Sequence, residues 1–120
     1  MPEVTASADV SVAPYDRSRL RSLELGFFWS PLKVFEALAS GVPTITLDIP
    51  PLNEIVRRDQ EGAFAKENDP EDLARVIVSL ATDRDRRLLL GRNARERAPL
   101  FSWAAHAAQV ESILRTLRAA

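Results

Sequence analysis

One short segment of the chain combines a lysine, a glutamate and a serine with the pattern of a helix that has a clear start and stop. Residues 30–43 read Ser-Pro-Leu-Lys-Val-Phe-Glu-Ala-Leu-Ala-Ser-Gly-Val-Pro. Ser30 is a suitable N-cap, Pro31 suits the first helical position, and Gly41 is a typical residue for ending a helix. The spacing therefore predicts a helix over residues 31–40.

Lys33 lies at the end of this predicted helix where a positive charge is unfavourable. A capping box would place Glu or Gln at the third helical position, because the helix N-terminus carries partial positive charge. A cation there forfeits about 0.3–1 kcal/mol relative to an anion, unless it is well solvated or a negative group lies beside it. A phosphate is the obvious partner, because the amides of Leu32, Lys33 and Val34 would point towards it together with the lysine charge.

The polar residues of the predicted helix share one narrow sector of the helical wheel. Lys33, Glu36 and Ser40 fall in that sector, and the helix is expected to be packed on most of its other sides. The apolar positions are Leu32, Val34, Phe35, Leu38, Ala39 and Val42. A polar strip facing a cleft would let Glu36 accept hydrogen bonds from ribose or sugar hydroxyls. The spacing leaves a simpler alternative open, in which Lys33 and Glu36 form an i,i+3 ion pair on a solvated face.

The segments around this helix alternate between strand and helix. A Val-rich run at residues 9–14 predicts a strand, residues 43–48 predict a second, and residues 62–65 a weak third. A helix between two strands gives a βαβ unit, in which the strands are parallel and ligands bind at their carboxyl ends. The loop over residues 15–29 lies at that edge and is longer than the roughly 2–6 residues usual for such connections.

The C-terminal half of the sequence is predicted to be helical. Asp69 starts one helix, Asp83 starts a second that runs towards residue 97, and Ser102 caps a last one. Asn53 is expected to cap a short helix that ends near residue 59. We therefore expect residues 1–120 to form a single α/β domain, a partial Rossmann-like fold with a short parallel sheet and a helical C-terminal half.

Length and composition are those of one ordinary soluble domain. The chain has 120 residues, of which 46% are hydrophobic and 28% charged, and its formal net charge of −1 predicts no general attraction to nucleic acid. Cysteine is absent, and the sequence has neither a signal segment nor an apolar run near the ~18 residues that span a bilayer. A cytoplasmic protein is the expectation. Because fourteen of the sixteen basic residues are arginine, a lysine in the first turn of a helix is noticeable.

Segment 30–43, preceded by Ala-Asp-Val-Ser-Val-Ala-Pro-Tyr at residues 8–15, resembles the C-terminal donor-binding domain of the group 1 glycosyltransferases. These enzymes have the GT-B fold, with two Rossmann-like domains and the active site between them. Further matches follow in the family's order at residues 52–56, at Gly62, and at residues 69–74 and 101–103. The resemblance covers nearly the whole chain.

The resemblance implies a binding role for each polar residue at the start of the helix. The helix N-terminus would bind the diphosphate of a UDP- or GDP-linked sugar, with Ser30, Leu32 and Lys33 at the phosphates and Glu36 at the ribose. Sugar transfer to an acceptor hydroxyl would then rely on the helix amides and Lys33 to stabilise the departing diphosphate. It implies no metal and no separate cofactor, and no catalytic residue is assigned.

Two departures from the family limit what the resemblance implies. Position 28, eight residues before Glu36, holds Phe where many members have an acidic residue that contacts the donor sugar. The resemblance also begins well inside the second domain, so the acceptor domain and the first strands of the donor domain are missing. We therefore expect this chain to be inactive by itself, as a fragment or as one half of a split enzyme.

Several other residues have candidate roles and simpler interpretations. Asp83 and Asp85 match the two-acid pattern of metal-dependent glycosyltransferases, but their position predicts a helix cap. His106, the only histidine, is expected on a partly exposed helix surface. Phe101 and Trp103 are expected to be packing anchors.

The arginines suggest two further contacts. Arg17, Arg19 and Arg21 lie in the long loop, from which they could reach a donor phosphate. The six arginines between residues 84 and 97 are interpreted as a solvated helix face, in preference to contact with an anionic membrane or a lipid-linked acceptor.

A different class of function remains open beside the donor domain. The chain could be a non-catalytic remnant or subunit that pairs with another chain, or with a second copy of itself, through surfaces that the missing strands would cover. A flavodoxin-like regulatory domain is a third interpretation. It needs a cluster of acids at the strand ends, which Asp9 and Asp48 do not form.

Overall fold

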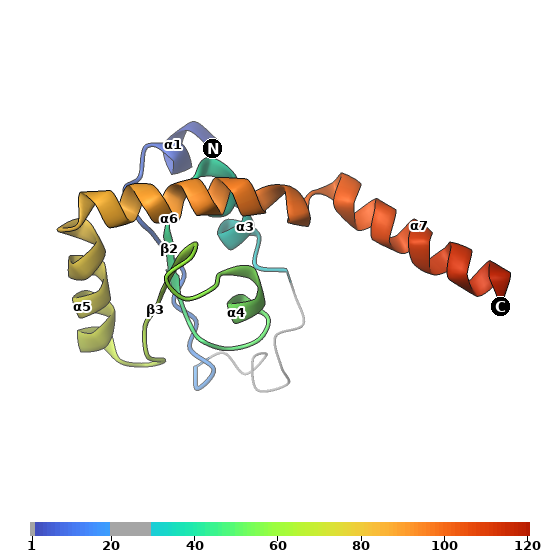
Figure 1. Cartoon of the computed structure of the whole chain (residues 1–120). Coiled ribbons are helices and arrows are strands. Elements are labelled where there is room, and N and C mark those ends of the chain that lie inside the picture. The colour runs from blue at the N-terminus through green and yellow to red at the C-terminus, as the bar shows by residue number, and fades with distance from the viewer. Residues whose placement is uncertain (1, 20–29) are drawn as a thin grey trace.

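The computed structural model describes residues 2–19 and 30–120 as a small α/β body from which one helix projects (Figure 1). The elements in chain order are α1 (Pro2–Ala6), β1 (Ser11–Val12), α3 (Leu32–Ser40), β2 (Thr44–Thr46), α4 (Leu52–Ile55), β3 (Gly62–Phe64), α5 (Pro70–Ala81), α6 (Arg84–Arg97), the 3₁₀ helix η1 (Ala98–Phe101) and α7 (Trp103–Ala119). Arg21 and Phe28 lie outside the described residues.

The three strands form one parallel sheet in the order β1-β2-β3, which confirms the predicted βαβ unit. Thr44 of β2 lies between Ser11 of β1 and Gly62 of β3. A Cβ at position 62 would lie 1.9 Å from the Thr44 carbonyl oxygen, so the close approach of β3 to β2 requires glycine there. The strands are shorter than predicted, because only two or three residues of each apolar run pair with a neighbour.

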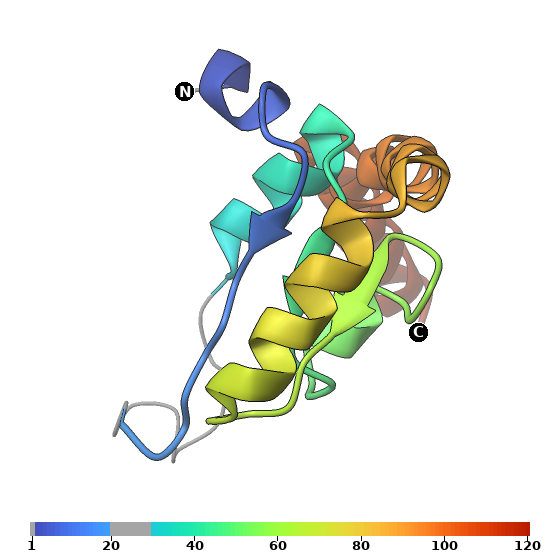
Figure 2. The ribbon, with the colours of Figure 1, turned by 90° about the vertical axis from the view of Figure 1, so that its left-hand side faces the viewer.

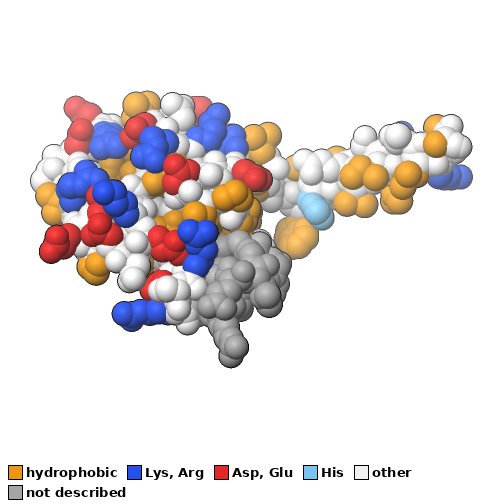
Figure 3. Space-filling model, turned by 90° about the horizontal axis from the view of Figure 1, so that it is seen from below, with side chains coloured by type: hydrophobic (Ala, Val, Ile, Leu, Met, Phe, Trp, Pro, Cys, Tyr) orange, Lys and Arg blue, Asp and Glu red, His pale blue; other side chains and the backbone are white. Residues whose placement is uncertain are grey.

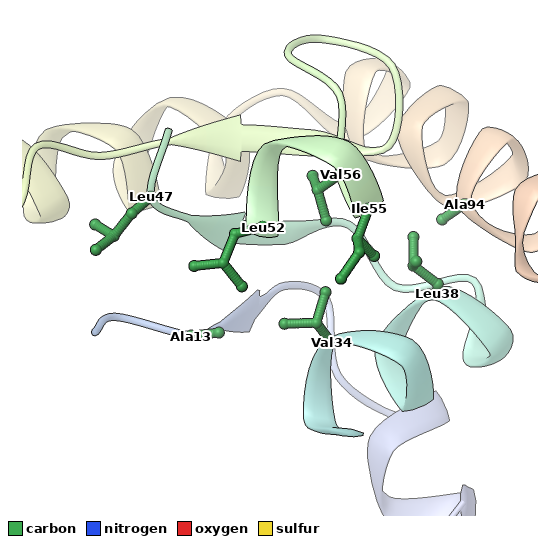
Figure 4. Close-up of a cluster of buried hydrophobic side chains, with 8 residues drawn as sticks. All are labelled: Ala13, Val34, Leu38, Leu47, Leu52, Ile55, Val56 and Ala94. Carbon is green, nitrogen blue, oxygen red and sulfur yellow. The ribbon is translucent and has the colours of Figure 1, made fainter. Parts of the chain in front are cut away.

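Helices cover both faces of the sheet and bury two apolar clusters. Helix α5 packs on one face (Figure 2), where its Val76 and Leu80 contact Ile45 of β2 and Ala63 of β3. Helices α3 and α4 cover the other face. Their cluster is shown in Figure 4 and consists of Ala13, Val34, Leu38, Leu47, Leu52, Ile55, Val56 and Ala94.

Three of the predicted helix starts in the C-terminal half are confirmed, and that of α4 is wrong. The side chains of Asp69, Asp83 and Ser102 each accept a hydrogen bond from the backbone N–H three residues later. Asn53, in contrast, lies inside α4, whose N-cap is Pro51, and its side chain donates to Asp48. The helix begins one residue before Asn53, so Asn53 is a helical residue and cannot be the cap. Helix α1 was not anticipated from the sequence.

Three arginines of α6 donate hydrogen bonds to the C-terminal ends of three other helices. Arg87 bonds to the Leu80 carbonyl of α5, Arg95 to the Ser40 carbonyl of α3, and Arg97 to the carbonyls of residues 54 and 55 in α4. Positive charge at a helix C-terminus is favourable, because the last carbonyls lack partners within the helix. Arg87 and Arg97 are therefore only partly solvated, whereas Arg95 stays exposed, so the predicted solvated face is confirmed only in part.

Helix α7 leaves the body and projects into solvent (Figure 1). The radius of gyration is 16.0 Å and the longest extent 53 Å, whereas a compact chain of this length has a radius of gyration of about 14 Å. None of the residues of α7 is buried. The body and α7 therefore share few contacts beyond the connection through η1.

Candidate functional site

The first turn of α3 lies beside the carboxyl end of β1. The Lys33 ammonium nitrogen is 5.0 Å from the centre of the Tyr15 ring, and Tyr15 follows β1 by three residues. The contact places Lys33 at the edge where parallel sheets bind ligands. This is the position that the sequence predicted for the candidate phosphate site.

The start of α3 differs from the predicted capped turn. The helix begins at Leu32, and its N-cap is Pro31, which makes no side-chain cap hydrogen bond, so the assignment of Ser30 as N-cap is wrong. The Leu32 amide donates to the Ser30 carbonyl at 3.0 Å, and the Val34 amide donates to the Pro31 carbonyl at 2.9 Å. Within the described part of the chain, the Lys33 amide has no such acceptor. Two of the three amides expected to face a phosphate are therefore already bonded to backbone carbonyls.

Tyr15 supplies the partner that the unfavourably placed lysine needs. An exposed cation–π contact contributes about 0.5–1 kcal/mol, which matches the cost of a cation at a helix N-terminus. Among the described residues Lys33 and Glu36 form no ion pair, although both lie on the exposed face that the simpler alternative predicted. Burial raises the pKa of the Tyr15 hydroxyl, so the ring stays neutral beside the ammonium group. Sequence reasoning assigned Tyr15 no role, although an aromatic residue directly after a strand-ending proline was a usable signal.

The buried side of α3 is narrower than the helical wheel predicted. Val34, Ala37 and Leu38 are buried, whereas the Leu32 side chain is 64% exposed. Ala39 is exposed as well. Helices α1 and α6 and the 3₁₀ helix η1 also pack against α3, yet none of them covers Leu32 or Ala39. Ser30, Leu32, Lys33 and Glu36 are therefore all accessible.

Glu36 and Lys33 have different surroundings, although they are one turn apart. Glu36 lines an open cavity of about 480 Å³ between α3 and η1, together with Phe35, Arg95 and Ser102. Phe35 also contacts Phe101 of η1, with the ring centres 5.2 Å apart. The carboxylate therefore stands at the mouth of a partly aromatic cavity, and the lysine stands at the sheet edge.

A second cavity lies at the carboxyl edge of the sheet, on the side of α5. It has a volume of about 290 Å³, and its wall is mainly apolar, with Tyr15, Leu47, Ala65 and Leu73 among its lining residues. Lys66, which follows β3, lies at its rim. The two lysines of the chain, Lys33 and Lys66, are therefore both at the carboxyl edge.

The described loop arginines are paired with carboxylates. Arg17 donates to both carboxylate oxygens of Glu67, with the closest contact at 2.7 Å, and Arg19 lies 3.3 Å from Asp16. The hydrogen bonds from Arg17 lower the pKa of Glu67. Arg17 and Arg19 each have an acidic partner in this structure, and contact with a donor phosphate stays a prediction. Arg21 lies outside the described residues.

The remaining candidates have structural positions. Asp83 caps α6 as expected, and in residues 2–19 and 30–120 no group of three or more metal-binding side chains occurs. His106 is exposed on α7. Phe101 packs against Phe35, but Trp103 is 85% exposed, so its prediction as a packing anchor is wrong because α7 leaves the body at that residue.

Comparison with known proteins identifies the family. The family model described as "Glycosyl transferases group 1" matches residues 1–83. The chain belongs to the group 1 glycosyltransferases. The fold agrees, because this glycosyltransferase chain matches the sucrose-phosphate synthase of Thermosynechococcus elongatus with a TM-score of 0.77 and 29% identity, over 97% of the chain and 27% of that protein.

Curated glycosyltransferases of several kinds resemble the chain. The D-inositol 3-phosphate glycosyltransferase of Corynebacterium kroppenstedtii is 35% identical over 82 residues, which are 68% of this chain and 18% of that protein. The sulfoquinovosyl transferase of Arabidopsis thaliana is 28% identical over 115 residues, 93% of this chain and 21% of that protein. This glycosyltransferase chain thus spans about a fifth of these relatives' length. In the part of the chain that the structure describes, no helix is long and apolar enough to cross a membrane.

Proposed function

We propose that this chain binds the nucleoside-diphosphate end of a sugar donor at the first turn of α3, as the donor-binding part of a glycosyltransferase. The observation that carries the proposal is the position of Lys33 beside Tyr15 at the carboxyl edge of the sheet, in a chain of this family. A UDP- or GDP-linked sugar is the expected donor class. Transfer to an acceptor hydroxyl requires the part of the enzyme that this chain does not contain.

The proposed contacts follow from the groups at the start of α3. The Lys33 ammonium group lies over the Tyr15 ring at the start of α3, where it can donate to a phosphate oxygen. The Ser30 hydroxyl is exposed and can donate beside it. Leu32 contributes its amide only if the bond to the Ser30 carbonyl opens. As negative charge develops on the departing diphosphate, these donors stabilise it.

Glu36 completes the proposed site one turn along the helix. Its exposed carboxylate can accept hydrogen bonds from the two hydroxyls of a ribose, with the nucleoside directed towards the cavity beside η1. The mechanism derived from these residues is therefore one of charge stabilisation and orientation. The cytoplasmic location inferred from the sequence stays a prediction.

The proposal is tested by calorimetric titration of the chain with UDP and with GDP. Lys33→Ala should weaken binding of the preferred nucleotide about tenfold or more, since a charge-assisted hydrogen bond contributes about 1.5–3 kcal/mol. Lys66→Ala is the matched control, because it removes the same charge at the same edge of the sheet. Glu36→Ala should weaken the binding of UDP or GDP but leave the binding of pyrophosphate unchanged. Equal effects of the two lysine variants, or no binding by the wild-type chain, would contradict the proposal.

A second function, pairing with another chain, is favoured by the surface of α7. An apolar row of Val110, Ile113, Leu114 and Leu117 is 43–68% exposed along this helix (Figure 3). We infer that a partner chain or a second copy covers it here.

The pairing function is tested by sedimentation at several concentrations. A mass that rises with concentration, and that falls to the monomer value for the chain truncated after Ser102, would support pairing through α7. A monomer mass at all concentrations, with no change on truncation, would rule out the second copy as the partner.

A further inference from the structure

We propose that a cavity at the amino edge of the sheet binds a ligand that carries phosphate groups. The cavity has a volume of about 510 Å³ and lies between the α1–β1 connection, the α3–β2 connection and α6. It faces the end of α3 opposite Lys33, because Gly41 and Pro43 are among its lining residues. Since the nine residues of α3 span about 13 Å, it is a separate site from the one proposed for the donor.

The floor of the cavity consists of small residues. Gly41 adopts a left-handed conformation with φ of 71°, and a Cβ at this position would lie 3.0 Å from the Arg95 guanidinium group. A Cβ on Gly91 would lie 2.4 Å from the Gly41 carbonyl oxygen. Glycine at both positions therefore lets α6 approach the α3–β2 connection and leaves backbone, rather than side chains, at the base of the cavity.

Two of the four arginines around the cavity are fixed by the fold. Arg87 donates to the Leu80 carbonyl at 2.8 Å, and its side chain is only 17% exposed. Arg95 donates to the Ser40 carbonyl at 3.0 Å. Each guanidinium group has five N–H donors, so both retain donors after these bonds are made. Because these two side chains are already held in place, they lose less conformational entropy when an anion binds.

The other two arginines of the cavity, Arg84 and Arg92, are exposed and make no hydrogen bond or ion pair with any described residue. Two carboxylates also line the cavity. Asp9 lies 3.7 Å from Arg87, a loose contact for a carboxylate that is 83% exposed, and Glu96 has no ion pair among the described residues. Four positive and two negative side chains thus leave an excess of positive charge, in a chain whose net charge is −1.

The chemistry of these groups favours phosphate. Guanidinium groups bind phosphate oxygens through paired N–H donors, and the larger charge of a phosphate suits a cavity with excess positive charge better than a single carboxylate does. Arg84 and Arg92 are about two turns apart on α6, a separation that suits a ligand with more than one phosphate group. The occupant is therefore a small diphosphate or the phosphate groups of a lipid surface.

The test for a free phosphate ligand is an amide NMR titration of the ¹⁵N-labelled chain with inorganic pyrophosphate. We expect the Gly41 and Gly91 amide signals to shift and saturate. Arg84→Gln/Arg92→Gln should weaken this response about tenfold or more, since the variant removes two charge-assisted contacts. Arg75→Gln/Arg118→Gln is the matched control, because it removes the same charge from exposed positions outside the cavity. Signals of Leu32 and Lys33 report separately on the proposed donor site.

The test for a lipid source is co-sedimentation with vesicles of equal parts phosphatidylcholine and phosphatidylglycerol. Sedimentation that Arg84→Gln/Arg92→Gln abolishes, and that the control variant retains, would assign the phosphate groups to lipid. The proposal is overturned if pyrophosphate leaves Gly41 and Gly91 unshifted and vesicle binding is absent or equal in both variants. It is also overturned if the pyrophosphate shifts are unchanged in Arg84→Gln/Arg92→Gln.

Discussion

Lys33 is positioned by an aromatic ring from the adjacent strand end. This contact stabilises a cation that local helix electrostatics would disfavour, and it keeps the ammonium group at the carboxyl edge of the sheet. A double-mutant cycle of Tyr15→Leu and Lys33→Met should give a coupling free energy of about 0.5–1 kcal/mol. Urea unfolding measures it, and Tyr15→Phe should retain the coupling because the ring remains. A coupling indistinguishable from zero would show that the contact contributes nothing to stability.

Glu61 is the fully buried carboxylate of the body, and Arg57 is its partner. Its oxygens accept hydrogen bonds from the Arg57 amide at 2.9 Å and from the Arg57 guanidinium group. Because the Arg57 side chain is 51% exposed, water can replace the carboxylate around the cation. Glu61→Ala should therefore lower the free energy of unfolding by about 1–3 kcal/mol, less than for a fully buried pair. Urea unfolding of Gln60→Ala, at an exposed neighbouring position, is the control and should show little change.

At the scale of elements, the contact between α6 and the end of α3 decides whether replacing Gly91 by alanine raises or lowers the free energy of unfolding. Helix propensity alone predicts that Gly91→Ala stabilises α6 by about 1 kcal/mol. The Cβ would lie 2.4 Å from the Gly41 carbonyl oxygen, so α6 must move away instead. We expect a net loss of about 1–3 kcal/mol in thermal or urea unfolding. Ala at the exposed Arg92 of the same helix should be nearly neutral, and a stabilised Gly91→Ala would contradict the described packing.

The segment after β3 is held by two carboxylates whose pKa values are lowered. Hydrogen bonds from Arg17 lower the pKa of Glu67, and the Lys66 amide, followed by Arg75, lowers that of Asp72. Both groups therefore stabilise the fold fully above their unfolded-state pKa, and this stabilisation is lost as the pH falls through the folded-state values. The urea midpoint should be flat above roughly pH 5 and decrease below roughly pH 4. The urea midpoint of Glu67→Gln should decrease less steeply than that of the wild type as the pH falls. An identical dependence on pH would contradict this role of Glu67.

At the scale of the whole molecule, α7 is an attachment to the folded body. Its residues are not buried, so a chain truncated after Ser102 should keep the urea midpoint of the full chain within the error of measurement. A large loss of stability on truncation would show that α7 packs on the body in solution. The same truncated chain should retain any nucleotide binding, because Lys33 and Glu36 contact no residue of α7.

The sequence by itself determined the local structure of this protein. The caps at Asp69, Asp83 and Ser102, the left-handed Gly41 and the parallel βαβ order depend on neighbouring residues, whose preferences are local. The family likeness, carried by residues 30–43, was also available at that level. A local pattern could not decide the partner of Lys33, because Tyr15 lies eighteen positions away and is brought close only by the sheet.

Only the tertiary structure decided what the arginines and apolar side chains do. From the sequence, residues 84–97 resemble a charged solvated helix, yet three of their arginines cap the ends of α3, α4 and α5, because α6 crosses those ends. Trp103 and Leu117 have the spacing of a packed helix, yet they are exposed because no described element lies against α7. Helical spacing fixes which residues share a face, and the arrangement of the other elements determines whether that face is covered.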